Sequence, residues 1–111
     1  MTDAPLTTVE IEPKGAVRSS VIWMHGLGAD ARDFEPIVPE LRLPDELGIR
    51  FVFPNAPIRP VTVNGGMRMR AWYDVLSMDL PRQEDPDGVY ASERGIYDLL
   101  EREKKRGVPA E

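Results

Sequence analysis

Few side chains in this sequence could take part in catalysis, and His25 is the candidate for a general base. It is the only histidine in the chain, and it directly precedes the turn Gly26-Leu27-Gly28. A histidine that acts as a general base needs a nucleophile and an orienting carboxylate within reach. At the corner between a strand and a loop, a lone histidine more often bonds to the backbone and holds the turn. We therefore interpret His25 as a structural residue.

The serines offer no marked nucleophile. A nucleophilic serine of the G-x-S-x-G type lies on a strained turn between a strand and a helix. Ser19, Ser20, Ser77 and Ser92 all lie outside such a motif. Because Ser19 and Ser20 fall in a predicted strand and Ser92 in a predicted helix, we interpret the serines as ordinary structural positions.

The glycine turn after His25 is the stretch best suited to bind negative charge. Residues 21–24 form an apolar run that predicts a strand buried on both faces, and a polar, helix-opening segment follows the glycines. Such a turn presents free backbone N–H groups at the rim of a sheet, where they suit a permanent or developing anion.

The same turn matches a nucleotide-binding pattern. Residues 26–31 fit G-x-G-x-x-A, the dinucleotide fingerprint, which needs a ribose-binding acid at the end of the next strand. The next predicted strand ends in Phe53-Pro54-Asn55 and has no carboxylate there. We therefore disfavour nucleotide binding.

The elements that must position this turn form an α/β unit. Residues 17–24 and 49–53 are predicted strands, and residues 34–41 are a predicted helix with Asp33 as its N-cap. Pro39 is expected to kink or delay this helix. A strand, helix and strand in this order predict a right-handed crossover between parallel strands.

Three further elements surround this unit. Residues 6–12 predict a half-solvated strand at or near a sheet edge. Residues 54–60 are expected to be irregular, and residues 61–63 and 67–70 to form a hairpin on an Asn-Gly turn. A second helix should begin near Asp85 with Pro86 first and stop at Gly107, and its charged residues 101–106 are expected to form a solvated face. Its apolar face is the set Val89, Ile96, Leu99 and Leu100.

Composition narrows the class of protein. A chain of 111 residues is one small domain by length. Its net charge of −5 argues against nucleic acid and anionic membranes as partners. The absence of cysteine and of a second histidine predicts no disulfide and no metal site. No basic leader or bilayer-length apolar run is present, so we expect no transmembrane segment and a cytoplasmic location.

Three blocks of sequence together resemble the carboxylesterase, lysophospholipase and acyl-protein thioesterase family of α/β-hydrolases. They are residues 21–28 (VIWMHGLG), residues 54–62 (PNAPIRPVT) and Trp72-Tyr73-Asp74. Their order and spacing cover nearly the whole chain. The resemblance implies that residues 1–111 are a partial α/β-hydrolase domain, the N-terminal half of its sheet, incomplete without the strand that carries the nucleophile.

The resemblance also implies roles for individual residues. Leu27 would donate one backbone N–H to the oxyanion hole, and His25, Gly26 and Gly28 would be structural. Met69, Trp72 and Leu76 would line the acyl or ester pocket. From the sequence alone, Trp72 and Tyr73 are equally well explained as core aromatics or as a pocket wall.

The Gly-x-Ser-x-Gly motif, the acid and the histidine of the family's triad do not occur in these 111 residues. Two hypotheses follow. In the first, the chain is the N-terminal part of a serine esterase or thioesterase that acts on small ester or thioester substrates without a cofactor. In the second, it is a non-catalytic half that pairs with another chain through its exposed sheet edge, residues 21–23, or binds an acyl ligand.

Overall fold

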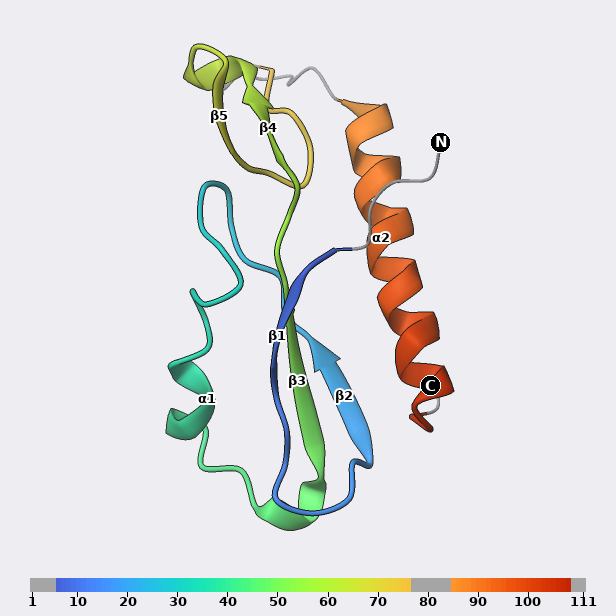
Figure 1. Ribbon diagram of the computed structural model, residues 1–111. Helices are drawn as coiled ribbons and strands as arrows, with labels where there is room; N and C mark the ends of the chain where they lie inside the picture. The colour runs from blue at the N-terminus through green and yellow to red at the C-terminus, as the bar shows by residue number, and fades with distance from the viewer. Residues whose placement is uncertain (1–5, 77–84, 109–111) are drawn as a thin grey trace.

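The computed structural model describes residues 6–76 and 85–108. Within these residues the chain builds a small mixed sheet with a helix on either side and a separate hairpin beyond one end (Figure 1). The order along the chain is β1 (Thr8–Ile11), β2 (Ser19–Ile22), α1 (Ile37–Glu40), the 3-10 turn η1 (Asp45–Leu47), β3 (Ile49–Pro54), β4 (Ile58–Val61), the 3-10 turn η2 (Thr62–Asn64), β5 (Met67–Arg70) and α2 (Pro86–Lys105).

The sheet has the strand order β1-β3-β2. β3 pairs antiparallel with β1 and parallel with β2, so the predicted parallel pair and the predicted edge strand are both confirmed. β3 is the central strand, and its residues Phe51, Val52 and Phe53 are buried. The carboxyl ends of β2 and β3 meet at one edge of the sheet, next to the β4–β5 hairpin (Figure 1).

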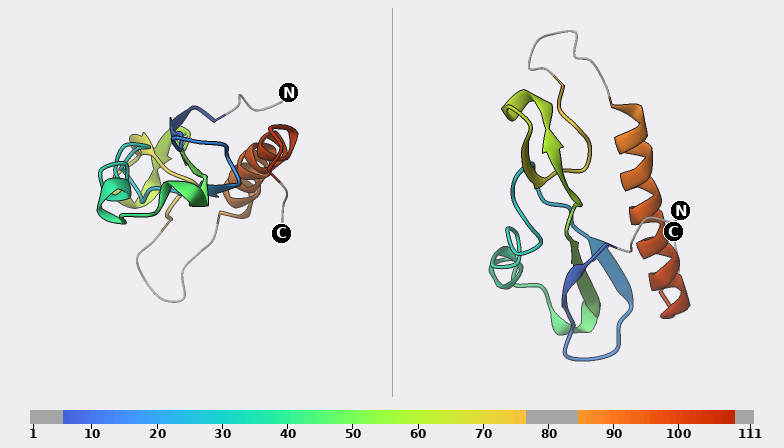
Figure 2. Two further views of the ribbon diagram at one scale, coloured as in Figure 1. Left: turned by 90° about the horizontal axis from the view of Figure 1, so that it is seen from below. Right: turned by 45° about the horizontal axis from the view of Figure 1, so that its top comes forward.

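Aromatic packing fills the space between the sheet and the segment around α1. Phe51 and Phe53 form the buried cluster with Ala31, and Trp23 stacks on Phe34 with ring centroids 5.1 Å apart. Both views in Figure 2 place α1 and α2 on opposite sides of the sheet. The fold is therefore a three-layer arrangement whose central layer carries the glycine turn at its end.

The first helix is much shorter than predicted. α1 has four residues, its N-cap is Pro36, and no side chain caps it. The predicted N-cap at Asp33 and the helix over residues 34–41 are therefore wrong. Proline disfavours the helical conformation in the residue before it, and Pro39 also lacks the N–H that would continue the helix.

The apolar run predicted that strand β2 would be buried on both faces, and this prediction is wrong. Val21 and Met24 are 39% and 40% exposed. Among the described residues β2 pairs with β3 alone, so its second edge is open. The apolar pattern of residues 21–24 fits a strand with neighbours on both sides, and one of these neighbours does not occur in the described part of the chain.

The hairpin forms, and its second strand β5 has the predicted bounds, but its first strand differs from the prediction. Its first strand is β4, which takes up part of the segment predicted to be irregular, and residues 62–64 form a 3-10 turn instead of a strand. Pro60 lies within β4. A proline is tolerated there because β4 is an edge strand, and its missing N–H costs no ladder bond when that side faces away from β5.

Helix α2 begins and ends as predicted. Asp85 is the N-cap and accepts a hydrogen bond from the Gly88 N–H at 3.1 Å, Pro86 is the first helical residue, and Gly107 follows the helix with φ +97°. Leu99 is buried, whereas Val89 and Leu100 of the same apolar face remain more than 40% exposed. No helix in the described residues is both long and apolar enough to cross a membrane.

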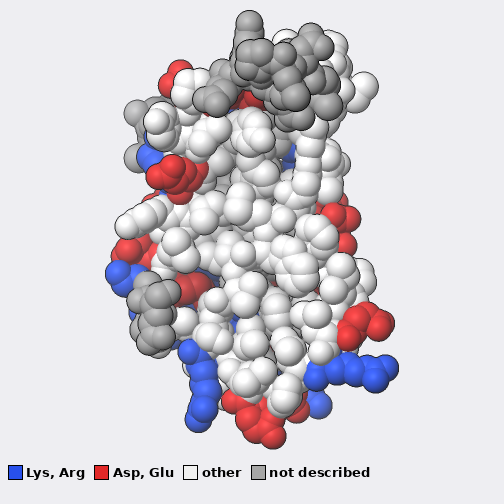
Figure 3. All heavy atoms as spheres, turned by 180° about the vertical axis from the view of Figure 1, so that it is seen from behind, with Lys and Arg blue, Asp and Glu red and all other residues white. Residues whose placement is uncertain are grey.

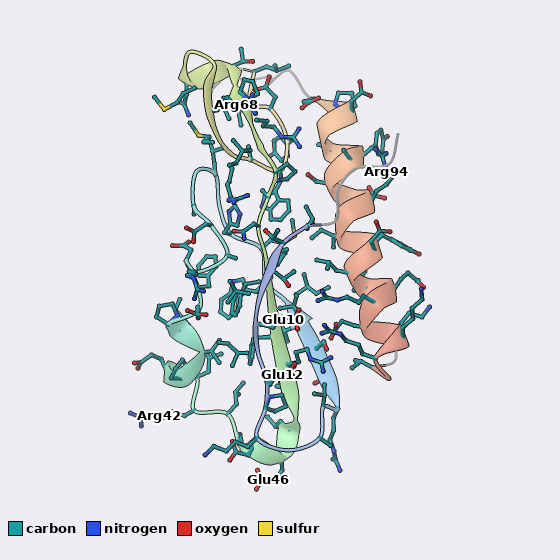
Figure 4. The ribbon with its side chains drawn as sticks, viewed as in Figure 1. Glu10, Glu12, Arg42, Glu46, Arg68 and Arg94 are labelled. Carbon is teal, nitrogen blue, oxygen red and sulfur yellow. The ribbon has the colours of Figure 1, made fainter. Side chains whose placement is uncertain are left out.

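The predicted solvated face at residues 101–106 is wrong in part, because Glu103 is only 3% exposed. Its carboxylate accepts hydrogen bonds from Ser20 at 2.5 Å, Arg50 at 2.9 Å and Arg106 at 3.0 Å. Glu10 on β1 accepts from Arg102 and Arg106, each at 2.8 Å, and Figure 4 shows Glu10 beside the C-terminal half of α2. We call this set the Glu103 cluster: Glu10, Ser20, Arg50, Arg102, Glu103 and Arg106.

Candidate functional site

The glycine turn lies just beyond the carboxyl end of β2, and two of its three amides, those of Gly26 and Leu27, have no hydrogen-bond acceptor in the described residues. Gly28 has φ +77°, a conformation that favours glycine, and its N–H donates to the Arg70 carbonyl at 2.9 Å. The Ala29 N–H donates to the Gly26 carbonyl at 3.2 Å. In the described part of the chain the Leu27 N–H has no hydrogen-bond acceptor. This exposed turn therefore presents backbone N–H groups to solvent.

The turn opens no helix, contrary to the prediction that a helix-opening segment follows the glycines. Residues 26–36 form turns and bends, and α1 begins only at Ile37. A dinucleotide site of the G-x-G-x-x-A type needs a helix N-terminus at this point for the pyrophosphate. The geometry therefore gives a second argument against nucleotide binding.

His25 is buried at the start of the turn, with 4% of its surface exposed. Its Nε2 accepts a hydrogen bond from the Ala56 N–H at 3.0 Å, so this nitrogen carries no proton. The proton is then on Nδ1, which donates to the Gly26 carbonyl at 2.6 Å. Both ring nitrogens are engaged with backbone groups, and neither is open to act as a base.

Trp72 closes the turn from the side of the hairpin. Its indole Nε1–H donates to the His25 carbonyl at 2.9 Å, and its ring lies 5.2 Å from the imidazole ring. The neighbouring Tyr73 is 45% exposed. The sequence left open whether these aromatics belong to the core or to a pocket wall. The half-buried ring of Trp72 does both, because it packs on His25 and also lines an open hollow.

The structure brings two of the three expected pocket residues to the turn. The sulfur of Met69 would lie 3.7 Å from a Cβ placed on Gly28, and Trp72 bonds to His25. Leu76 is partly buried and is not among the residues that line the hollow beside Trp72.

Asp74 ties the segment after Trp72 to the hairpin. Its carboxylate accepts from the Thr62 hydroxyl at 2.5 Å and from the Thr62 N–H at 2.7 Å, and these hydrogen bonds lower the pKa of Asp74. The Asp74 N–H donates to Asp85, the N-cap of α2, at 2.8 Å. The hairpin, the Trp72 segment and α2 are therefore linked through two aspartates.

The described serines hold structural positions. Ser20 donates to Glu103, and Ser92 on α2 donates to the Trp72 carbonyl. Ser19 is an exposed residue of β2. Ser77 lies outside the described residues. Within residues 6–76 and 85–108, no three His, Asp or Glu side chains could together hold a metal ion.

An apolar hollow of about 410 Å³ lies between the end of β2, the Trp72 segment and α2. The lining residues are Met24, Trp72, Tyr73, Val89, Ser92, Glu93, Ile96, Tyr97 and Leu100. Figure 3 shows the back of the molecule, where the middle of the surface carries few charged side chains. Met24 and Leu100, which are 40% and 43% exposed, are apolar residues that this chain leaves uncovered.

Comparison with known proteins decides the family. The profile described as Phospholipase/Carboxylesterase matches residues 7–111. The chain belongs to this family. Among its relatives, acyl-protein thioesterase 1 of Schizosaccharomyces pombe is 36% identical over 108 residues, which are 97% of this chain and 47% of the relative. Acyl-protein thioesterase 1 homolog 1 of Dictyostelium discoideum is 37% identical over 94 residues, 84% of this chain and 42% of the relative.

Solved structures of the same family confirm the fold. Zea mays acyl-protein thioesterase 2 superposes with a TM-score of 0.76 at 33% identity, covering 86% of this chain and 40% of that one. Arabidopsis thaliana SOBER1 also gives 0.76, at 28% identity, covering 84% of this chain and 45% of that one. The fold is therefore part of an α/β-hydrolase, and the chain spans about half the length of the curated relatives it matches.

Sequence reasoning missed two residues that the site uses. The sequence assigned no contact to Asn55, yet its side chain accepts a hydrogen bond from the Ala31 N–H after the turn. The role of Ala56 could not be predicted, since a backbone N–H leaves no signature in the residue type. The block Pro54-Asn55-Ala56-Pro57 was a signal for the family, but nothing in it indicated which group would bond to His25.

Proposed function

We propose that this chain supplies the oxyanion-hole side of a serine carboxylesterase or thioesterase. The supporting observation is the Leu27 N–H, which has no acceptor within residues 6–76 and 85–108 and belongs to an exposed residue between β2 and the bonded N–H of Gly28. A preorganised N–H is effective because it stabilises the charge that develops on the carbonyl oxygen in the tetrahedral intermediate. The match to the Phospholipase/Carboxylesterase family and to acyl-protein thioesterases supports esters and thioesters as the proposed substrate class.

In this proposal the nucleophile, the acid and the base come from residues other than these 111. His25 is an unsuitable base because its two nitrogens bond to Ala56 and Gly26. The described serines lie outside a nucleophile turn. A serine supplied from elsewhere would attack the carbonyl, the Leu27 N–H would stabilise the oxyanion, and water would then hydrolyse the acyl-enzyme. Met69 and Trp72 flank the turn and would contact the acyl or leaving group, and Leu76 would line the same pocket.

The polypeptide that contains these residues in its source cell can be tested with a fluorophosphonate, which reacts with nucleophilic serines. We expect one labelled serine, in a peptide outside residues 1–111, and loss of thioester hydrolysis in proportion to labelling. A polypeptide that contains residues 1–111, stays unlabelled and hydrolyses neither esters nor thioesters would contradict the proposal. A cytoplasmic location and the absence of nucleic-acid partners remain predictions.

The open edge of β2 favours a second candidate function, a non-catalytic half that pairs with another chain. Val21 of β2 is exposed, and so is Met24, two residues beyond the end of this strand, which also lines the apolar hollow beside α2. An added strand would complete the sheet and cover the hollow. The same surface would bind an acyl ligand in the absence of a partner. The fluorophosphonate test separates the two candidates, since only the first requires a reactive serine.

A further inference from the structure

Two consecutive residues after β3 hold the two ends of residues 25–31, the segment that contains the glycine turn. At the near end, the Ala56 N–H donates to Nε2 of His25 at 3.0 Å. At the far end, the Ala31 N–H donates to Oδ1 of Asn55 at 2.7 Å. The free Leu27 amide lies between these two attachment points.

The side chain of Asn55 is itself fixed by the residue before β1. A backbone N–H can only donate, so the atom that faces Ala31 must be the carbonyl oxygen of the Asn55 amide. Its Nδ2 then donates to the Thr7 hydroxyl at 3.0 Å, and the Asn55 N–H donates to the Thr7 carbonyl at 2.8 Å. The rotamer of Asn55 is therefore set by bonds on both sides.

We propose that Asn55 is a positioning residue for the turn that presents the Leu27 amide. The proposal rests on the proposed oxyanion role of Leu27 and adds a residue that acts through the turn without touching the substrate. The side chain of Ala31 is packed in the core at 3% exposure, so a bond to its N–H fixes the turn to both the core and the sheet. An oxyanion donor depends on such fixation, because a displacement of about 1 Å can cost about a hundredfold in rate.

The chemistry of the side chain makes the proposal testable by substitution. In Asn55→Leu, which has a similar shape, both polar atoms are lost, and the Ala31 N–H has no acceptor. In Asn55→Asp, one oxygen can accept from Ala31 and the other from the Thr7 hydroxyl, so the connection can be kept. Asn64→Leu is the matched control, since the Asn64 side chain donates only to the Met69 sulfur, at 3.6 Å on the exposed hairpin.

The experiment is amide hydrogen exchange, followed by NMR at 10 °C, in the polypeptide that contains these residues in its source cell. The quantity compared is the exchange rate of the Ala31 amide divided by that of the Trp23 amide, which is bonded to Val52 between β2 and β3. Because both amides open when the whole chain unfolds, this ratio separates loss of the local bond from loss of global stability.

We expect Asn55→Leu to raise the ratio by about tenfold and to shift the amide resonances of residues 26–30, with Asn55→Asp restoring both and Asn64→Leu changing neither. An unchanged ratio in Asn55→Leu, or a ratio in Asn55→Asp as high as in Asn55→Leu, would overturn the proposal. The result does not depend on catalysis. Failure of the oxyanion role would appear in substitutions of Leu27 instead, with the exchange ratios unaffected.

Discussion

At the scale of single residues, the imidazole of His25 joins three segments that lie far apart in the sequence. It accepts from Ala56 after β3, donates to the turn at Gly26, and packs on Trp72 beyond the hairpin. The type and position of this residue indicated a structural role from the sequence, and the geometry supports it. The partner Ala56 could not be predicted, because it contributes only a main-chain donor.

Replacing His25 with leucine is expected to destabilise the fold by about 1–3 kcal/mol. The substitution leaves the Ala56 N–H buried without an acceptor, since Ala56 itself has 0% exposure. The free energy of unfolding, measured by urea titration with circular dichroism, tests this. Trp72→Phe is the control that keeps an aromatic ring beside position 25 and removes only the indole donor, and we expect a smaller loss of about 1 kcal/mol. Equal midpoints for wild type and His25→Leu would contradict the assigned role.

At the scale of elements, the C-terminal half of α2 is attached to the sheet by ion pairs between side chains as well as by apolar contacts. Burial raises the pKa of Glu103, but hydrogen bonds from Ser20 and Arg50 and the charge of Arg106 outweigh it and lower the pKa below the ordinary 4.5. Burial also raises the pKa of Glu10, but its contacts with Arg106, Thr8 and Arg102 outweigh burial and lower this pKa as well. Both carboxylates are therefore stabilised in the charged form when the chain is folded.

A lowered pKa in the folded state makes stability depend on pH in one direction. The contribution of Glu103 is complete above about pH 4.5, where the unfolded carboxylate is also ionised, and it is lost as the pH falls through the lowered folded value. We expect the urea concentration at the unfolding midpoint to decrease when the pH is lowered from 6 to 3. Glu103→Gln should lower the midpoint at pH 6 and flatten this dependence.

Glu101→Gln is the matched control for this prediction. Glu101 lies on the exposed side of the same helix, where it pairs with Lys104 at 3.5 Å. A surface pair of this kind contributes little, so the pH dependence should match that of the wild type. If Glu103→Gln and Glu101→Gln give the same pH profile, the Glu103 cluster does not attach α2 in the way described.

The elements differ in how well sequence could predict them. Asp85, Pro86 and Gly107 marked the ends of α2 because caps are local chemistry. The burial of Glu103 could not be predicted, since this residue stands in a run of charged residues whose other members are typical of a solvated helix face. The single turn of α1 shows the opposite case, in which Asp33 was the predicted cap of a longer helix and the prolines limit the helix to four residues.

At the scale of the whole molecule, the sheet that residues 6–76 and 85–108 build is open along β2. The sequence predicted a strand with neighbours on both sides, and that prediction of burial failed because it described a larger sheet than these residues build. Exposed apolar residues on an open strand edge favour association with another strand. The chain by itself is therefore expected to be marginally stable or to self-associate.

Sedimentation over a range of protein concentrations tests this expectation. We expect the average mass of the chain to rise above 12.5 kDa with concentration, and Val21→Lys to reduce this rise because the charge lies on the open edge. Leu47→Lys is the control, since Leu47 is 46% exposed but lies in η1, away from a strand edge. A monomer at all concentrations with a sharp, cooperative thermal transition would contradict the prediction.

The most direct test of the central claim is a comparison of Leu27→Pro with Leu27→Ala in the polypeptide that contains these residues in its source cell. Proline removes the amide proton, whereas alanine removes the side chain and keeps the donor. We predict that Leu27→Pro lowers kcat for a thioester substrate by about 100- to 1,000-fold, and that Leu27→Ala stays within a few-fold of wild type at an equal urea midpoint. A folded Leu27→Pro variant with wild-type kcat would show that the Leu27 amide is not an oxyanion donor.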